Sequence, residues 1–93
     1  MADNKKRVLF IVNPVSGVNQ SRKSVLADVA AERFDPELFE WEIRLSESAV
    51  HVQELSRDAA ATGVDIIVAV GGDGTLNQVV KGMIGSNATL ALV

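Results

Sequence analysis

An apolar run that leads straight into a glycine-rich loop constrains this chain more than any other stretch. Residues 65–70 are almost entirely apolar and β-branched, which is typical of a buried strand. Residues 71–75 then bring three glycines and one aspartate, and a helix-like segment follows over about 76–84. Glycines let a ligand approach the main chain, and a helix N-terminus offers free N–H groups and a partial positive charge. The sequence therefore predicts a strand–loop–helix unit that binds phosphate.

Three other segments have strand patterns, and two have helix patterns. Residues 8–12 are apolar throughout, and residues 88–93 are apolar except for Thr89, as expected of strands that are covered on both faces of a parallel sheet. Residues 39–45 alternate between apolar and charged side chains, which predicts a strand with one buried face at the edge of a sheet. Helix-like segments over 21–34 and about 49–62 connect these strands. Strands and helices thus alternate along the chain.

This alternation predicts an α/β fold in three layers, with helices on both faces of a parallel sheet. If residues 39–45 form an edge strand, the order 2-1-3-4 places the first and third strands side by side. The loops after these two strands, residues 13–17 and 71–75, would then flank the topological switch point, where open parallel sheets bind their ligands.

Composition excludes several classes of function. The net charge of −3 argues against a nucleic-acid binder with a broad basic face, and the absence of cysteine excludes disulfides and thiolate metal sites. No apolar run approaches the ~20 residues of a membrane-spanning helix. We therefore expect a cytoplasmic domain without nucleic-acid partners.

The side chains of the glycine loop admit two interpretations each. The loop is neither a Walker loop nor the dinucleotide pattern G-x-G-x-x-G. Asp73 beside an anion site is unfavourable unless a cation or a transferring proton lies between, which indicates magnesium–nucleotide chemistry. Alternatively, Asp73 hydrogen-bonds the turn amides. Thr75 and Gln78 fit a helix capping box, which competes with any role in ligand binding.

Two motifs together resemble the diacylglycerol kinase catalytic-domain family, which includes bacterial lipid kinases and sphingosine and ceramide kinases. The first is Asn13-Pro14-x-Ser16-Gly17 and the second is Gly72-Asp73-Gly74-Thr75-Leu76-Asn77. The resemblance spans essentially the whole chain. It implies a Rossmann-like domain similar to the N-terminal domains of phosphofructokinase and NAD kinase. It also implies transfer of the γ-phosphoryl group of ATP to a lipid hydroxyl, with Mg²⁺.

The resemblance also implies which residues bind the nucleotide. Asp73 would be the carboxylate on the side of the phosphates and the metal, and the sequence contains no separate set of metal ligands. The residues that would contact ATP lie in the two loops, at the end of the second strand and in the first turns of the last helix; they are Asn13, Pro14, Val15, Ser16, Gly17, Ser46, Gly71, Gly72, Gly74, Thr75, Leu76, Asn77 and Gln78.

The chain departs from the family pattern in two respects. Gln78 stands where the family usually has glutamate. The sequence also ends where the family continues into a second, β-rich domain that carries the general base and most of the lipid site. We therefore expect residues 1–93 to be the N-terminal, ATP-binding part of a lipid kinase that is inactive alone. Peripheral membrane contact would involve only the absent part, and the unpaired edge of the last strand would favour a homodimer.

Two alternatives compete with this interpretation. NAD kinase and phosphofructokinase use similar glycine–aspartate loops, although Asn77 and the motif at 13–17 favour the lipid branch. A non-catalytic nucleotide-binding module of the same fold is the second alternative.

Overall fold

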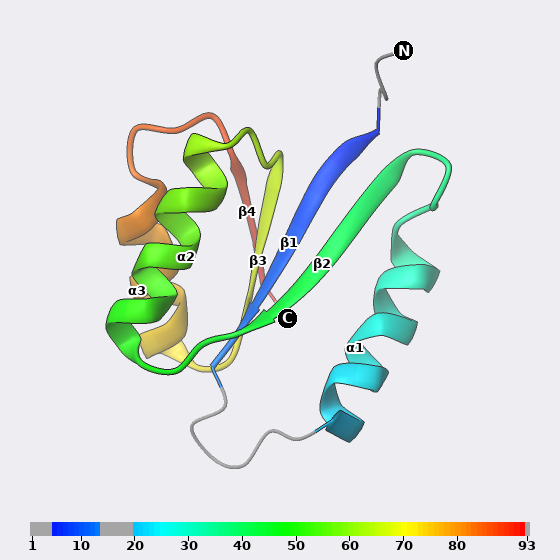
Figure 1. Cartoon of the computed structure of the whole chain (residues 1–93), viewed down its shortest axis with the longest axis horizontal. Coiled ribbons are helices and arrows are strands. Elements are labelled where there is room, and N and C mark those ends of the chain that lie inside the picture. Colours follow the sequence, from blue (N-terminus) through cyan, green and yellow to red (C-terminus); the bar gives the residue numbers. More distant parts are fainter. Residues whose placement is uncertain (1–4, 14–19, 93) are drawn as a thin grey trace.

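The computed structural model describes residues 5–13 and 20–92. Within them, strands and helices alternate as the sequence predicts (Figure 1). The strands are β1 (Lys6–Val12), β2 (Phe39–Leu45), β3 (Ile66–Val70) and β4 (Thr89–Leu92). The helices are α1 (Gln20–Arg33), α2 (Ala49–Ala61) and α3 (Asp73–Met83).

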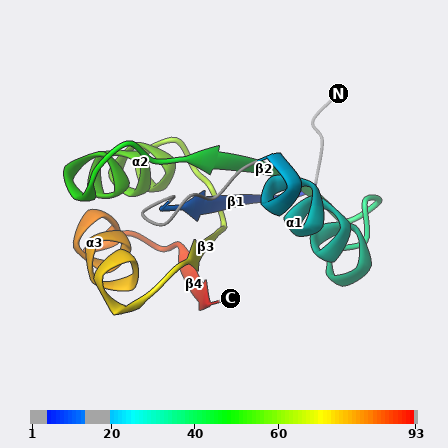
Figure 2. The ribbon, with the colours of Figure 1, turned by 90° about the horizontal axis from the view of Figure 1, so that it is seen from below.

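The strand order is β2-β1-β3-β4, and every described pair is parallel. This confirms the predicted order 2-1-3-4. The connection from β1 to β2 runs in one direction along the sheet, whereas the next two connections run in the other. Right-handed crossovers therefore place α1 on one face and α2 with α3 on the opposite face. Figure 2 shows the three layers, with the sheet between α1 and the other two helices.

The core consists of two apolar clusters, one on each face of the sheet. Alternate residues over 8–12 of β1 and 67–70 of β3 belong to opposite clusters. These parts of both central strands are therefore buried on both faces, which explains why they are apolar without interruption. The cluster under α2 and α3 contains Leu9, Ile11, Val52, Ala59, Val64, Ile67, Ala69 and Val79. The cluster on the α1 side contains Val8, Phe10, Val12, Ala30, Val68 and Val70.

Helices α2 and α3 touch at a point where no side chain fits between them. A Cβ atom on Gly82 would lie 2.5 Å from the carbonyl oxygen of Gln53 and 2.9 Å from the backbone nitrogen of Arg57. Next to this contact, the buried Ser56 hydroxyl donates a hydrogen bond to the carbonyl of Val79 over 2.6 Å. The pair of helices therefore packs as one unit over the central strands.

The N-terminus of α2 is capped from both directions. Ser48 is the N-cap, and its hydroxyl oxygen accepts the backbone N–H of His51 at 3.1 Å. In return, Nδ1 of His51 accepts the backbone N–H of Glu47 at 2.9 Å. The predicted start of this helix is confirmed. The single histidine closes an arrangement that is similar to a capping box, except that it binds the N–H of the residue before the N-cap. At the other end, Gly63 has a φ of 88°, which is typical of a glycine that terminates a helix.

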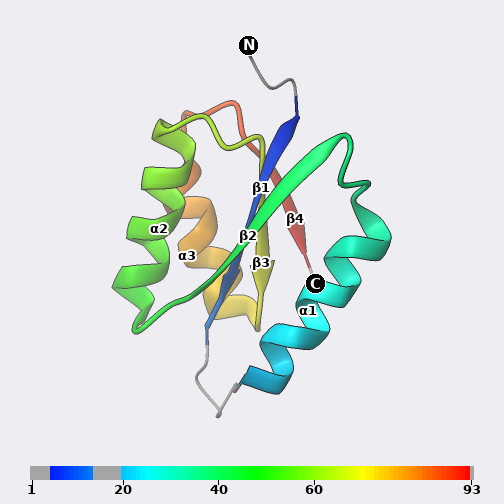
Figure 3. The ribbon, with the colours of Figure 1, turned by 45° about the vertical axis from the view of Figure 1, so that its right-hand side comes forward.

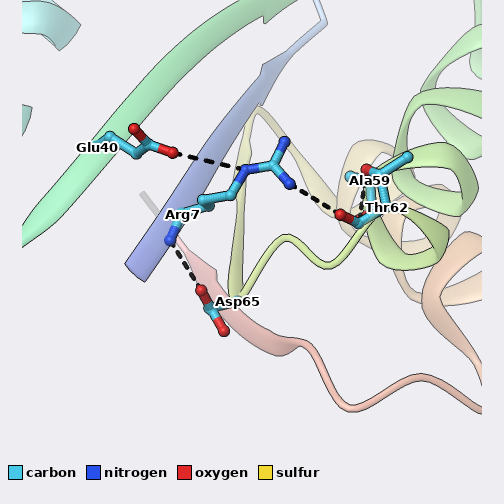
Figure 4. Close-up of polar contacts among 5 residues, drawn as sticks. All are labelled: Arg7, Glu40, Ala59, Thr62 and Asp65. Carbon is cyan, nitrogen blue, oxygen red and sulfur yellow. Dashed lines mark hydrogen bonds and ion pairs between the residues drawn. The ribbon is translucent and has the colours of Figure 1, made fainter. Parts of the chain in front are cut away.

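Arg7 joins three elements at the amino ends of the strands (Figure 4). Its guanidinium donates to the carbonyl of Thr62 over 2.8 Å, and its Nε lies 3.7 Å from the Glu40 carboxylate. Its backbone N–H donates to the Asp65 carboxylate over 2.8 Å. These contacts hold β1 against β2 and against the turn after α2, at the end of the sheet opposite to the glycine loop.

The prediction that the last strand is buried is wrong. The residues of β4 are half-buried or exposed, and Leu92 is 62% exposed. In the described part of the chain, β4 pairs only with β3, so it lies at an edge of the sheet. Figure 3 shows β4 at that edge, beside β3. The edge position agrees with the predicted order 2-1-3-4, whereas the described residues do not provide the predicted cover on both faces of this strand.

Candidate functional site

The carboxyl ends of β1, β2 and β3 bring three of the predicted site residues together. The backbone N–H of Asn13 donates to the carbonyl of Val70 over 3.4 Å, so Asn13 lies beside the first glycine of the loop. Ser46 donates to the carbonyl of Val12 from its backbone N–H over 2.8 Å and from its hydroxyl over 3.2 Å. For Asn13, the one described residue of the first loop, this confirms the predicted proximity of the loops after the first and third strands. Pro14, Val15, Ser16 and Gly17 lie outside the described residues.

Helix α3 begins earlier than the sequence predicts. Its N-cap is Gly72 and its first residue is Asp73, rather than a residue near Leu76. No side-chain hydrogen bond from the described part of the chain caps it. The predicted capping box of Thr75 and Gln78 is therefore wrong, because Thr75 is already inside the first turn. The sequence pattern predicts that Gly74 belongs to a loop, whereas the helix accommodates this glycine at its second position.

Gly71 is required by the fold itself. Its φ of 147° is strained for residues with a side chain. A Cβ atom at this position would also lie 2.7 Å from Oγ1 of Thr75. Thr75 is only 4% exposed, so it fills the space directly over the turn. The sharp change of direction from β3 into α3 therefore rests on a contact between the bare Gly71 backbone and the Thr75 side chain.

Gly72 and Gly74 differ from Gly71 because the fold does not require them. A Cβ atom added to either one would meet nothing within 4 Å, and neither has a positive φ. Glycine inside a helix is less favourable than alanine by about 1 kcal/mol. Two glycines with open space above them, one at the N-cap and one in the first turn, leave the backbone accessible to a ligand.

The first turn of α3 offers donors and one carboxylate at this open surface. The first described intrahelical bond joins the N–H of Leu76 to the carbonyl of Gly72 over 3.2 Å. The preceding amides, those of Asp73, Gly74 and Thr75, are the ones that a helix leaves without an intrahelical acceptor. The Asp73 side chain is exposed beside them. The start of α3 thus offers backbone donors of the kind that bind anions, with one exposed carboxylate beside them.

The predicted site residues fall into two groups by burial. Asp73 and Asn77 are exposed on successive turns of α3 and can reach a ligand with their side chains, while Gln78 is half-buried. Leu76 packs against the core, and Thr75 and Ser46 are almost fully buried, at 4% and 2% exposure. These three residues support the loop from below rather than present a side chain to the open surface.

Residues 5–13 and 20–92 hold no group of three or more His, Cys, Asp or Glu side chains that could bind a metal ion. Nor does this part of the chain include a helix long and apolar enough to cross a membrane. A groove of about 420 Å³ lies between β2 and α2, but none of the predicted site residues lines it.

Comparison with known proteins identifies the family. The family model of the diacylglycerol kinase catalytic domain matches residues 7–93. The diacylglycerol kinase of Bacillus subtilis (strain 168) is 36% identical over 78 residues, which are 84% of this chain and 25% of that protein. A putative lipid kinase of Streptococcus pneumoniae serotype 4 is 32% identical over 79 residues, which are 84% of this chain and 26% of that protein.

A plant protein shows a similar match. Sphingosine kinase 1 of Arabidopsis thaliana is 32% identical over 79 residues, which are 85% of this chain and 16% of that protein. The chain therefore spans about a quarter of the bacterial relatives and less of the plant one. The match supports the lipid branch over NAD kinase and phosphofructokinase. The chain belongs to the diacylglycerol kinase catalytic-domain family, whose two loop motifs it carries at the carboxyl ends of β1 and β3.

Proposed function

We propose that this chain is the ATP-binding part of a lipid kinase, which transfers the γ-phosphoryl group of ATP to a lipid hydroxyl. The proposal rests on the family and on the names of the three relatives, a diacylglycerol kinase, a putative lipid kinase and a sphingosine kinase. The acceptor site and the general base would lie in chain beyond residues 1–93. The lipid substrate, and any contact with a membrane, would belong to that longer protein.

One observation carries the assignment of the nucleotide site: the open space above Gly72 and Gly74 at an N-terminus without a side-chain cap. The backbone amides of Asp73, Gly74 and Thr75 would donate to phosphate oxygens, with the helix dipole adding a favourable field. Asn77, exposed one turn later, would hydrogen-bond the same end of the nucleotide. Gly71 and Thr75 would hold the loop in the shape that aims these amides outward.

The residues present also fit a magnesium-bound nucleotide. Asp73 is an exposed carboxylate next to an anion-binding helix end, an arrangement that is favourable when a cation lies between the two negative groups. When bound, Mg²⁺ neutralises the charge that accumulates on the phosphate oxygens during transfer. Asp73 would hold that ion, and the amides would orient the chain of phosphates. Both contributions are positioning and charge neutralisation, which dominate catalysis of phosphoryl transfer.

Calorimetric titration of ATP onto this chain, with and without Mg²⁺, tests the proposal. We expect Asp73→Asn to remove most of the gain in affinity that Mg²⁺ provides, and to change the affinity for metal-free ATP little. Equal loss in both titrations would indicate that Asp73 serves the loop, and no binding by the folded chain would contradict the nucleotide site. If the chain is instead a non-catalytic nucleotide-binding module, the longer protein should have no lipid kinase activity. Tight binding by this chain, with no phosphoryl transfer to diacylglycerol or sphingosine by the longer protein, would support it.

A further inference from the structure

The outer edge of β2 is a long unpaired strand edge with self-complementary charges. Within the described residues, β2 pairs with β1 alone and lies at one end of the sheet order. In Figure 2 no helix or strand lies beyond it. Because β2 has seven residues and β4 only four, β2 presents the longer of the two edges. Exposed edges of this length pair readily with another strand unless something prevents it.

The hydrogen bonds to β1 show which backbone groups of β2 point outward. The carbonyl of Leu38 and the N–H of Ser46, both at even positions, bond to Lys6 and Val12 of the β1 side. Backbone groups alternate in direction along a strand, so the outward groups belong to the odd positions, Phe39, Trp41, Ile43 and Leu45. A partner strand must therefore present its own outward residues opposite these.

We propose that a second copy of this chain pairs with β2 in antiparallel orientation, with the two-fold axis at Glu42. This register aligns odd positions with odd positions, which satisfies the outward backbone groups of both copies. It places Trp41 opposite Ile43 of the other copy and Phe39 opposite Leu45 of the other copy. These aromatic and aliphatic pairs are among those that stabilise neighbouring strands. All four side chains are half-buried in the single chain, so a partner can cover what remains exposed.

The charges on the other face of β2 favour the same register. Glu40 faces Arg44 of the other copy, and the two-fold axis repeats this opposite-charge pair. In this register Glu40 and Arg44 of the other copy occupy a non-hydrogen-bonded pair of the antiparallel ladder. Facing side chains lie closest together in pairs of this type. Their side chains are 53% and 58% exposed in the single chain, so both are accessible to a partner. The unfavourable approach of the two Glu42 carboxylates is offset because each lies 2.7 Å from Nε of its own Arg44.

The edge of β4 lacks comparable specificity. Its residues Thr89, Leu90, Ala91 and Leu92 carry no charge, so they specify neither an orientation nor a register. A second copy on β4, which the sequence alone suggested, is therefore the alternative outcome of the test. An edge interface of one strand is small, and we expect dissociation in the micromolar range or weaker, at about 10⁻⁶ M or above.

Charge reversal on β2 separates these possibilities. Sedimentation velocity of this chain over a concentration series should show a monomer–dimer equilibrium. Glu40→Arg and Arg44→Glu each place like charges opposite one another, and each should weaken the dimer about tenfold or more. When the two variants are mixed, their heterodimer again has opposite charges facing each other at both pairs, so it should bind more tightly than either variant alone. The double variant should also recover affinity by itself. Recovery should be partial in both cases, because Glu42 loses its own Arg44 partner wherever Arg44 is replaced. Leu92→Glu, on the β4 edge, is the matched control and should leave the dimer unchanged.

Three results would overturn the proposal. They are a monomer at every soluble concentration, weakening of the dimer by Leu92→Glu but not by the β2 variants, and loss of the dimer in both single variants without recovery on mixing. Circular dichroism of every variant checks that the fold is retained. Because both reversed side chains are exposed, the monomer itself should lose no more than the small stability of a surface ion pair.

Discussion

Replacing Gly74 with alanine should raise the stability of this chain and lower its affinity for ATP. Gly74 is the second residue of α3, its φ is not positive, and a Cβ atom there meets nothing within 4 Å. Alanine in a helix is favoured over glycine by about 0.8–1.0 kcal/mol, and somewhat less in the first turn. We therefore expect a gain of about 0.5–1 kcal/mol in the free energy of unfolding. In a domain of this size, that gain raises the midpoint of thermal unfolding by about 2–8 °C.

The same methyl group would project into the space that the phosphate is proposed to occupy. A phosphate oxygen that accepts from the Gly74 or Thr75 amide must come within about 3 Å of the nitrogen, and the new methyl group obstructs that approach. We expect the affinity for ATP to fall about tenfold or more, which corresponds to about 1.4 kcal/mol. The affinity for adenosine, which has no phosphate, should change little.

Thermal unfolding followed by circular dichroism, together with calorimetric titration of ATP and adenosine, measures both effects. Lys81→Ala, an exposed change near the other end of the same helix, is the control and should leave ATP affinity unchanged. A more stable variant with unchanged ATP affinity would refute the phosphate-loop assignment. A less stable variant would refute the claim that the fold has no need of this glycine.

Further substitutions separate residues that support the loop from residues that face the ligand. Gly71→Ala should destabilise the chain by about 1–3 kcal/mol in thermal unfolding, because its φ of 147° and the 2.7 Å approach to Thr75 leave no room for a methyl group. Gly72→Ala should lose at most about 1 kcal/mol, as alanine is a poorer N-cap than glycine, yet still weaken ATP binding in calorimetry. Gly82→Ala should destabilise by about 1–3 kcal/mol or more, because the methyl group meets the α2 backbone at 2.5 Å, and ATP affinity per folded molecule should be unchanged. Ser48→Ala should cost about 1 kcal/mol through loss of the α2 cap, and equal stability would contradict the role of that cap.

The order of the strands could be predicted from sequence because one strand differed from the others. The alternation of charged and apolar residues over 39–45 identified an edge, and right-handed crossovers then determined the sides on which the helices lie. The same reasoning failed for β4, whose uniform apolar sequence indicated burial. Periodicity reports the polarity of the two faces, whereas burial depends on which elements lie against them, and no local pattern contains that information.

The start of α3 could not be predicted from sequence for a related reason. Propensity places glycines outside helices, so it predicts that the first turn belongs to the loop and that Thr75 is a cap. The structure begins the helix at Asp73 because Gly71 alone makes the turn, with Thr75 packed against it. That contact joins two residues four apart through a φ value that only glycine adopts readily. The role of His51 in the cap of α2 escaped prediction because histidine is not one of the usual residues at that position of a capping box.

The early start of α3 changes how the whole motif is interpreted. If the helix began near Leu76, all three glycines would be turn residues, and their presence would follow from the turn alone. With the helix beginning at Asp73, only Gly71 is explained by the turn, while Gly72 and Gly74 occupy positions where the fold accommodates any small residue. Glycine at the second position of a helix lowers the stability of the fold, and no packing contact among the described residues requires it there. A ligand that contacts the backbone supplies the missing reason, and it must be one that seeks several N–H groups at once, as a phosphate does.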